Sequence, residues 1–82
     1  MSQTQITIFT QTGCYPCTLW KKWLNEQNIP FTEKNIKEDK DALNEFDKLG
    51  LEYTPHTFVE HKKEKYEIKG LGQKKMLRIL NS

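Results

Sequence analysis

The stretch QITIFTQTGCYPCTLW, residues 5–20, decides the fold of this chain. Its first part, Gln5 to Thr10, alternates apolar and polar side chains and is rich in β-branched residues, a pattern typical of a β-strand. Apolar residues then recur at helical spacing, which predicts a helix from Pro16 to Asn28. The apolar stripe of this helix, in which we assign both tryptophans to the core, consists of Leu19, Trp20, Trp23 and Leu24.

The residues after this helix predict a second strand over Phe31 to Ile36. A strand, a helix and a strand within about 30 residues form a βαβ unit, whose strands are parallel and joined by a right-handed crossover. The next segment predicts a helix that is capped by Asp39 or Asp41 and ends at Gly50, with an apolar face of Ala42, Leu43, Phe46 and Leu49. A hairpin of Thr57–His61 and Lys65–Ile68 is expected after it. A last helix is expected to bury Met76, Leu77 and Leu80. The order β-α-β-α-β-β-α predicts an α/β fold with a four-stranded mixed sheet and three flanking helices.

The length and composition predict one small domain that spans residues 1–82. Of the 82 residues, 35% are apolar and 29% are charged. The longest uncharged stretch, Met1 to Trp20, is interrupted by polar residues, so it predicts neither a membrane span nor a signal peptide. We therefore expect a cytoplasmic monomer that does not bind membranes.

The charge is distributed unevenly along the chain. The net charge of +2 is too small to predict a nucleic-acid-binding protein. Residues 33–53 carry seven acidic residues against four lysines, whereas residues 54–82 carry seven basic residues against three acidic ones. The basic C-terminal third is either a solvated surface or a surface that attracts an acidic partner.

The two cysteines of the chain are separated by two residues, in the sequence Cys14-Tyr15-Pro16-Cys17. A structural disulfide is not expected, because the cytosol is reducing and so short a loop constrains little of the unfolded chain. At the point where a strand passes into a helix, this spacing favours reversible dithiol chemistry, since the helix N-terminus stabilises a thiolate. We expect Cys14 to attack a substrate disulfide and Cys17 to resolve the mixed disulfide.

Proline within this motif affects the expected helix start and the thiolate. Proline favours the first helical position, so Tyr15 is the predicted N-cap. Pro16 also lacks a backbone N–H, so one of the amides that could reach the Cys14 sulfur is missing. We therefore predict a thiolate that is less stabilised than in a Cys-Pro-x-Cys arrangement.

Three segments together resemble the glutaredoxins, especially the small glutaredoxin-like redoxins of the NrdH type. They are residues 6–17, ITIFTQTGCYPC, then Thr54-Pro55, and then Gly70-Leu71-Gly72. The resemblance implies a thioredoxin-like fold and a dithiol-disulfide oxidoreductase. It also implies a cis Thr54-Pro55 bond, with the backbone of Thr54 pairing with an incoming peptide or with glutathione.

The sequence departs from glutathione-using glutaredoxins at two places. Those proteins usually carry Lys or Arg where this chain has Gln11, and acidic residues where it has Gln73-Lys74-Lys75. A lysine facing the glutathione ammonium would repel it. This favours an NrdH-like redoxin, which takes its electrons from thioredoxin reductase and needs no cofactor. Its client would be a protein disulfide, typically that of ribonucleotide reductase. The alternative is a glutathione-dependent glutaredoxin.

The resemblance also implies a docking surface for the client around Cys14. Tyr15 and Leu71 would be exposed apolar side chains beside the sulfur, and Gly70 and Gly72 would either admit another backbone or end secondary-structure elements. The expected substrate-binding residues are Gln11, Tyr15, Pro16, Thr54, Pro55, Gly70 and Leu71.

Three other functions compete with dithiol chemistry. A zinc site would combine the cysteines with His56 and His61, but residues five apart in a strand face opposite sides of the sheet, so we expect no metal. His56 is then a surface residue or a proton donor to the thiols, and His61 faces solvent. An iron–sulfur cluster would need a glutathione ligand. A non-enzymatic binding module would not need two thiols.

Overall fold

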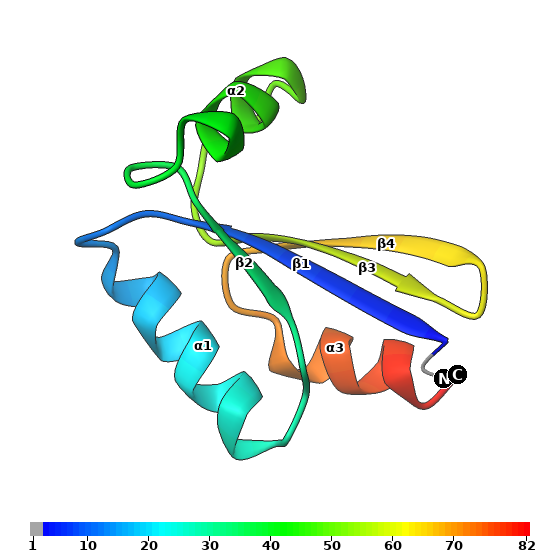
Figure 1. Ribbon diagram of the computed structural model, residues 1–82. Helices are drawn as coiled ribbons and strands as arrows, with labels where there is room; N and C mark the ends of the chain where they lie inside the picture. Colours follow the sequence, from blue (N-terminus) through cyan, green and yellow to red (C-terminus); the bar gives the residue numbers. More distant parts are fainter. Residues whose placement is uncertain (1–2) are drawn as a thin grey trace.

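The computed structural model describes residues 3–82, and their elements follow the predicted order β-α-β-α-β-β-α (Figure 1). The elements are β1 (Thr4–Thr10), α1 (Tyr15–Glu26), β2 (Thr32–Asn35), α2 (Lys40–Lys48), β3 (His56–His61), β4 (Glu64–Lys69) and α3 (Gln73–Leu80). Residues 1 and 2 of the expected 1–82 domain lie outside the described residues. None of the helices within residues 3–82 has the length and apolar character that crossing a membrane requires.

The four strands form one mixed sheet in the order β2-β1-β3-β4. Strands β1 and β2 are parallel, as the βαβ pattern predicted, whereas β3 is antiparallel to both β1 and β4. Helices α1 and α3 cover one face of the sheet, and α2 lies on the other side (Figure 1). This is the thioredoxin-like α/β fold that the family resemblance implied.

The main core lies between the sheet and the pair α1 and α3. Trp20 is fully buried there and donates a hydrogen bond from Nε1 to Thr57 Oγ1 at 2.9 Å. Trp23 is partly buried and stacks on Trp20, with ring centroids 5.4 Å apart. Both tryptophans are therefore core residues, as predicted. The buried members of this cluster are Ile6, Ile8, Trp20, Leu24, Val59, Ile68, Met76 and Ile79.

The two short helices bury narrower faces than the sequence predicted. On α2, Ala42 and Phe46 are buried, and Phe46 packs against Phe9 with ring centroids 5.9 Å apart. Leu43 and Leu49 are 38% and 52% exposed, so the buried face of α2 is narrower than its apolar stripe. On α3 the prediction for Leu77 was wrong. The buried positions are Met76 and Ile79, three residues apart, with Leu80 partly buried, and Leu77 points to solvent.

Both histidines of β3 are buried, so the expectation of surface histidines was wrong. His56 is 5% exposed and His61 is 8% exposed. The sequence pattern did not reveal that β3 is an interior strand, flanked by β1 and β4. Each ring has a polar partner. His56 Nε2 lies 2.7 Å from Glu67 Oε1, and His61 Nδ1 lies 2.6 Å from Thr4 Oγ1.

The element ends differ from the predicted ones by one or two residues. Helix α1 ends at Glu26 rather than Asn28, which has a left-handed backbone at φ 58°. Strand β2 is shorter than predicted, and each of its residues pairs with β1. The hairpin turn consists of Lys62 and Lys63, both with positive φ, as in the tight turns that match strand twist.

Candidate functional site

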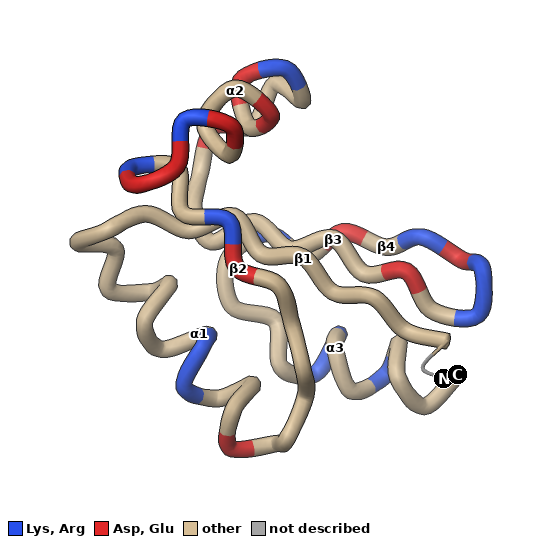
Figure 2. Tube along the Cα trace, in the orientation of Figure 1, with Lys and Arg blue, Asp and Glu red and all other residues tan. Residues whose placement is uncertain are grey.

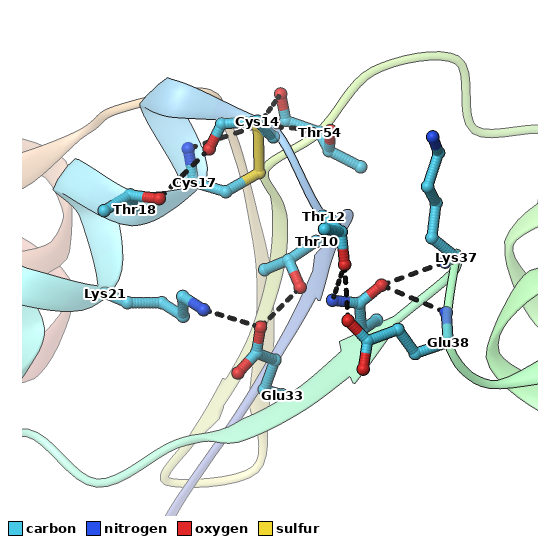
Figure 3. Close-up of polar contacts among 11 residues, drawn as sticks. Thr10, Thr12, Cys14, Cys17, Thr18, Lys21, Glu33, Lys37, Glu38 and Thr54 are labelled. Carbon is cyan, nitrogen blue, oxygen red and sulfur yellow. Dashed lines mark hydrogen bonds and ion pairs between the residues drawn. A yellow bond between two sulfur atoms is a disulfide. The ribbon is translucent and has the colours of Figure 1, made fainter.

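The cysteine pair lies where β1 passes into α1 and forms a disulfide, with the two Cα atoms 5.2 Å apart. Cys17 is 2% exposed, whereas Cys14 is partly exposed. Cys14 is therefore the more exposed of the two cysteines, and Cys17 lies inside the protein. Figure 3 shows the disulfide with the side chains around it.

Cys14 is the N-cap of α1, so the prediction that Tyr15 would be the N-cap was wrong. Cys14 has an extended backbone, and its Sγ accepts a hydrogen bond from the Cys17 amide at 3.2 Å. The sulfur thus replaces the side-chain oxygen that usually caps a helix, which the residue-type preferences for caps do not anticipate. Tyr15 and Pro16 follow in the first turn, which contains no acidic residue. Pro16 has no amide to donate, as the sequence indicated.

The loop before β3 contacts the same sulfur from the opposite side. The Thr54-Pro55 peptide bond is cis, as the family resemblance implied. Thr54 Oγ1 donates a hydrogen bond to Cys14 Sγ at 3.4 Å, and the Thr54 carbonyl oxygen lies 3.6 Å from that sulfur (Figure 3). Pro55 is buried, whereas Thr54 is partly exposed.

Gln11 is partly exposed, and its side chain is bonded to the cis-proline loop. Its Nε2 donates a hydrogen bond to Thr54 Oγ1 at 3.1 Å. Its backbone oxygen accepts a bond from the Cys14 amide at 3.2 Å. The expected substrate-binding position is thus engaged inside the site, between the two loops that meet at Cys14.

The C-terminal glycine segment is tied to the cis-proline loop. The Gly70 amide donates to the Pro55 carbonyl at 2.9 Å, which brings Gly70 and the following Leu71 to this end of the sheet. Gly72 has an internal role, because a Cβ there would lie 2.6 Å from Ile68 Cγ2. The structure thus accounts for Gly72 by packing within the chain rather than by the approach of another backbone.

Apolar and aromatic groups are exposed on this side of the molecule. Tyr15 is 71% exposed and Leu71 is 43% exposed, and Pro16 is also exposed. The segment from the end of β1 into the first turns of α1 carries no charged residue, and it is uniformly tan in Figure 2. The segment that carries Cys14 therefore presents apolar groups and backbone rather than charge.

A polar cluster lies near the disulfide, and the sequence analysis missed it. Glu33 Oε2 of β2 accepts hydrogen bonds from Thr10 Oγ1 at 2.6 Å and from Lys21 Nζ at 2.8 Å (Figure 3). Partial burial acts to raise the pKa of Glu33, but the hydrogen bonds from Lys21 and Thr10 and the charge of Lys21 outweigh it and lower that pKa. The alternation of apolar and polar residues along β2 does not predict this contact, because the partners of Glu33 lie on β1 and α1.

The histidines do not approach the cysteines to form a metal-binding group. Within residues 3–82, no three His, Cys, Asp or Glu side chains are placed so that they could hold a metal ion. His56 follows the cis proline, but its ring is paired with Glu67 on β4. His61 lies at the far end of β3, beside Thr4.

Fold and site together define a thioredoxin-fold protein with a Cys-x-x-Cys disulfide at the start of its first helix. The sequence model of the glutaredoxin family, described as "Glutaredoxin", matches residues 6–63. This chain belongs to the glutaredoxin family.

Similar proteins include redoxins and a group of regulators. The "Glutaredoxin-like protein NrdH" of Lactococcus lactis subsp. cremoris is 32% identical over 50 residues, which cover 61% of this chain and 69% of that protein. The "Global transcriptional regulator Spx 1" of Oceanobacillus iheyensis is 39% identical over 44 residues, which cover 54% of this chain and 34% of that protein. The matched segment thus spans about a third of the regulator's length.

Solved structures extend the similarity over nearly the whole fold. The crystal structure of the thioredoxin-like protein BC3987 superposes with a TM-score of 0.74 and 25% identity, covering 93% of this chain and 100% of that chain. Thioredoxin f2 of Chlamydomonas reinhardtii, at 20% identity, has a TM-score of 0.70, with 99% of this chain and 79% of that chain covered. The second comparison concerns the fold alone.

Proposed function

We propose that this protein is a dithiol-disulfide oxidoreductase that reduces protein disulfides through Cys14 and Cys17. The observation that carries the proposal is the position of the Cys14 sulfur. Cys14 is partly exposed at a helix N-terminus, beside the exposed side chains of Tyr15 and Pro16, and its sulfur is bonded to that of the buried Cys17. Attack by one sulfur and resolution by the other require this asymmetry.

The reaction proceeds through two exchanges of sulfur bonds. In the reduced protein, the Cys14 thiolate attacks one sulfur of the client disulfide, forms a mixed disulfide and releases the first client thiolate. The Cys17 thiolate then attacks Cys14 Sγ, which restores the internal disulfide and releases the second client thiolate. Two electrons pass to the client, and each released thiolate takes a proton from solvent.

Strand-like pairing of the client with the backbone of Thr54 supports this chemistry. The Thr54 carbonyl lies 3.6 Å from Cys14 Sγ, so a peptide paired there would bring its own disulfide to the sulfur. Tyr15, Pro16 and Leu71 then provide exposed apolar contacts, and Pro55 and Gly70 hold the loop in place through their hydrogen bond.

We further propose an NrdH-like electron donor that is recycled by thioredoxin reductase in the cytoplasm, with ribonucleotide reductase as a client. The similarity to the NrdH protein of Lactococcus supports this reading. Gln11, which stands where a basic residue would hold the glutathione carboxylate, is engaged with Thr54. Lys75, near the expected site of the glutathione ammonium, donates to the Glu67 carbonyl at 2.6 Å and keeps a positive charge there.

A comparison of two reducing systems tests the proposal. The pure protein is supplied with NADPH and either thioredoxin reductase or glutathione with glutathione reductase, and reduction of a protein disulfide is followed by NADPH consumption. We expect turnover with thioredoxin reductase only. Turnover with glutathione only would instead support a glutathione-dependent glutaredoxin, which the family match favours as the second candidate. No turnover with either system would support a non-enzymatic binding module.

Variants of the two cysteines test the assigned roles. Cys14→Ser is expected to abolish turnover, because the attacking sulfur is removed. Cys17→Ser is expected to retain the first exchange and to accumulate a mixed disulfide, which intact-mass measurement detects as a covalent adduct of client and protein. Accumulation of the adduct in Cys14→Ser instead would reverse the two roles.

A further inference from the structure

The Cys14 sulfur receives hydrogen bonds from two sides. The Cys17 amide donates from within α1 at 3.2 Å, and the Thr54 hydroxyl donates from the cis-proline loop at 3.4 Å. The second donor is separated from Cys14 by 40 positions in the sequence. It comes from outside α1, so it adds a donor to the sulfur where Pro16 has no amide to offer.

Gln11 directs the Thr54 hydroxyl toward the sulfur. A hydroxyl group has one proton to donate and can also accept hydrogen bonds. Thr54 Oγ1 accepts a hydrogen bond from Gln11 Nε2 at 3.1 Å, so its own proton is available for the sulfur. Gln11 therefore donates to Thr54, and Thr54 in turn donates to the Cys14 sulfur. We call these two consecutive hydrogen bonds the relay.

We infer that the Thr54 hydroxyl, held by Gln11, stabilises the thiolate of Cys14 in the reduced protein. The inference rests on the proposed function, in which Cys14 reacts as a thiolate. A hydrogen bond to an anionic sulfur is stronger than one to a neutral disulfide sulfur, so the relay favours the reduced, ionised form. Thr54 is then a catalytic residue that touches the reacting atom, and Gln11 is a positioning residue.

Other groups around Cys14 also affect whether its sulfur is a thiol or a thiolate. The Thr54 carbonyl at 3.6 Å accepts hydrogen bonds, so it favours the protonated thiol. Cys17 is the titratable group of α1 that faces Cys14, and the first turn of α1 has no acidic residue. Three titratable groups of the other elements bond to partners other than Cys14: Glu33 to Thr10 and Lys21, Glu38 to Thr12, and His56 to Glu67.

Three variants of the full chain separate the relay from general effects on the fold. Thr54→Val removes the hydroxyl with little change in volume, Thr54→Ser keeps the hydroxyl, and Gln11→Leu removes the group that orients it. Thr12→Val is the matched control. It removes a hydroxyl from the loop before Cys14, but this hydroxyl donates to Glu38 at 2.6 Å and not to the sulfur.

The readouts are the pKa of Cys14 and the dithiol-disulfide equilibrium against a reference redox couple. The pKa is taken from the alkylation rate of Cys14 as a function of pH, with the alkylated residue identified by mass. In Thr54→Val we expect this pKa to rise by roughly half to one unit, as for the loss of one hydrogen bond of typical net strength. We expect the equilibrium to shift toward the disulfide by about 3- to 10-fold, where tenfold corresponds to about 30 mV.

The variants rank in a defined order. Gln11→Leu is expected to raise the pKa of Cys14 by less than Thr54→Val, and Thr54→Ser and Thr12→Val are expected to leave it near the wild-type value. An unchanged pKa and equilibrium in Thr54→Val would overturn the inference, as would equal shifts in Thr54→Val and Thr54→Ser. These measurements need no client, so their failure is distinguishable from failure of the proposed function, which the two reductase systems test.

Discussion

At the residue scale, the reactivity of this protein depends on the donors that surround one sulfur atom. Cys14 caps α1 and accepts a bond from the Cys17 amide, and Pro16 contributes no amide to it. The helix dipole and the amide both favour a thiolate over a thiol. Substitutions within the Cys-x-x-Cys motif therefore alter the acidity of Cys14 most directly by changing the number of backbone amides near its sulfur.

Exchanging the two central residues of the motif tests the contribution of the missing amide. The double variant Tyr15→Pro, Pro16→Tyr restores an N–H at position 16, so we expect the pKa of Cys14 to fall by about half to one unit. The pH dependence of Cys14 alkylation measures this shift. Tyr15→Ala is the control for loss of the tyrosine from position 15. A double variant with a Cys14 thiol less acidic than in the wild type would contradict the prediction.

At the element scale, a single carboxylate links the three parts of the βαβ unit. Glu33 on β2 binds Thr10 at the end of β1 and Lys21 on α1. These contacts hold the middle of α1 against the sheet (Figure 3). The side chains of Lys21 and Glu33 are each 32% exposed, so solvent screens their ion pair in part.

The stability of this unit is predicted to depend on pH through Glu33. Its pKa is lowered in the folded protein, so its contribution is complete above its ordinary value of 4.5 and is lost as the pH falls through the folded value. We expect Lys21→Met to lower the free energy of unfolding at pH 7 by about 0.5–1 kcal/mol. As the pH falls from 7 to 3 and Glu33 takes up a proton, the difference between the variant and the wild type should shrink.

Denaturant unfolding at the two pH values measures this dependence. Lys22→Met is the matched control, since Lys22 is the neighbouring lysine and is exposed on the same helix. An equal loss of stability in both variants, or a difference for Lys21→Met that is the same at pH 3 and pH 7, would show that Glu33 does not carry the effect.

At the scale of the whole molecule, the redox site and the lysines of the β3–β4 turn lie at opposite ends of the sheet. The uncharged segment that leads into α1 is at one end, whereas Lys62 and Lys63 are at the other (Figure 2). One hydrophobic core between the sheet and the pair α1 and α3 supports both ends.

Removal of the largest buried side chain is predicted to unfold much of the protein. Trp20 is fully buried and hydrogen-bonded to Thr57, so Trp20→Ala should cost about 3–5 kcal/mol of the free energy of unfolding. A chain of this length has a total stability of about the same size. Circular dichroism with thermal unfolding measures the loss. Tyr53→Ala, at a side chain that is 73% exposed, should change the stability by less than about 0.5 kcal/mol. A cooperative, near-wild-type transition in Trp20→Ala would contradict the prediction.

The order of elements, the parallel β1–β2 pair and the position of Cys14 at a helix N-terminus were all predictable from the sequence. Each depends on local rules, namely the period of apolar residues, the positions of proline and glycine, and the length of a crossover. The cis Thr54-Pro55 bond was implied by the family resemblance rather than by any local pattern.

The tertiary structure alone decided which side chains meet. It buried His56 and His61, exposed Leu77, joined Glu33 to α1, and placed the Gln11 and Thr54 side chains in series with the Cys14 sulfur. These contacts join positions far apart in the sequence, so they depend on strand order, on register and on how the loops meet at the end of the sheet. No period or motif within one segment contains that information, because it arises only when the segments pack together.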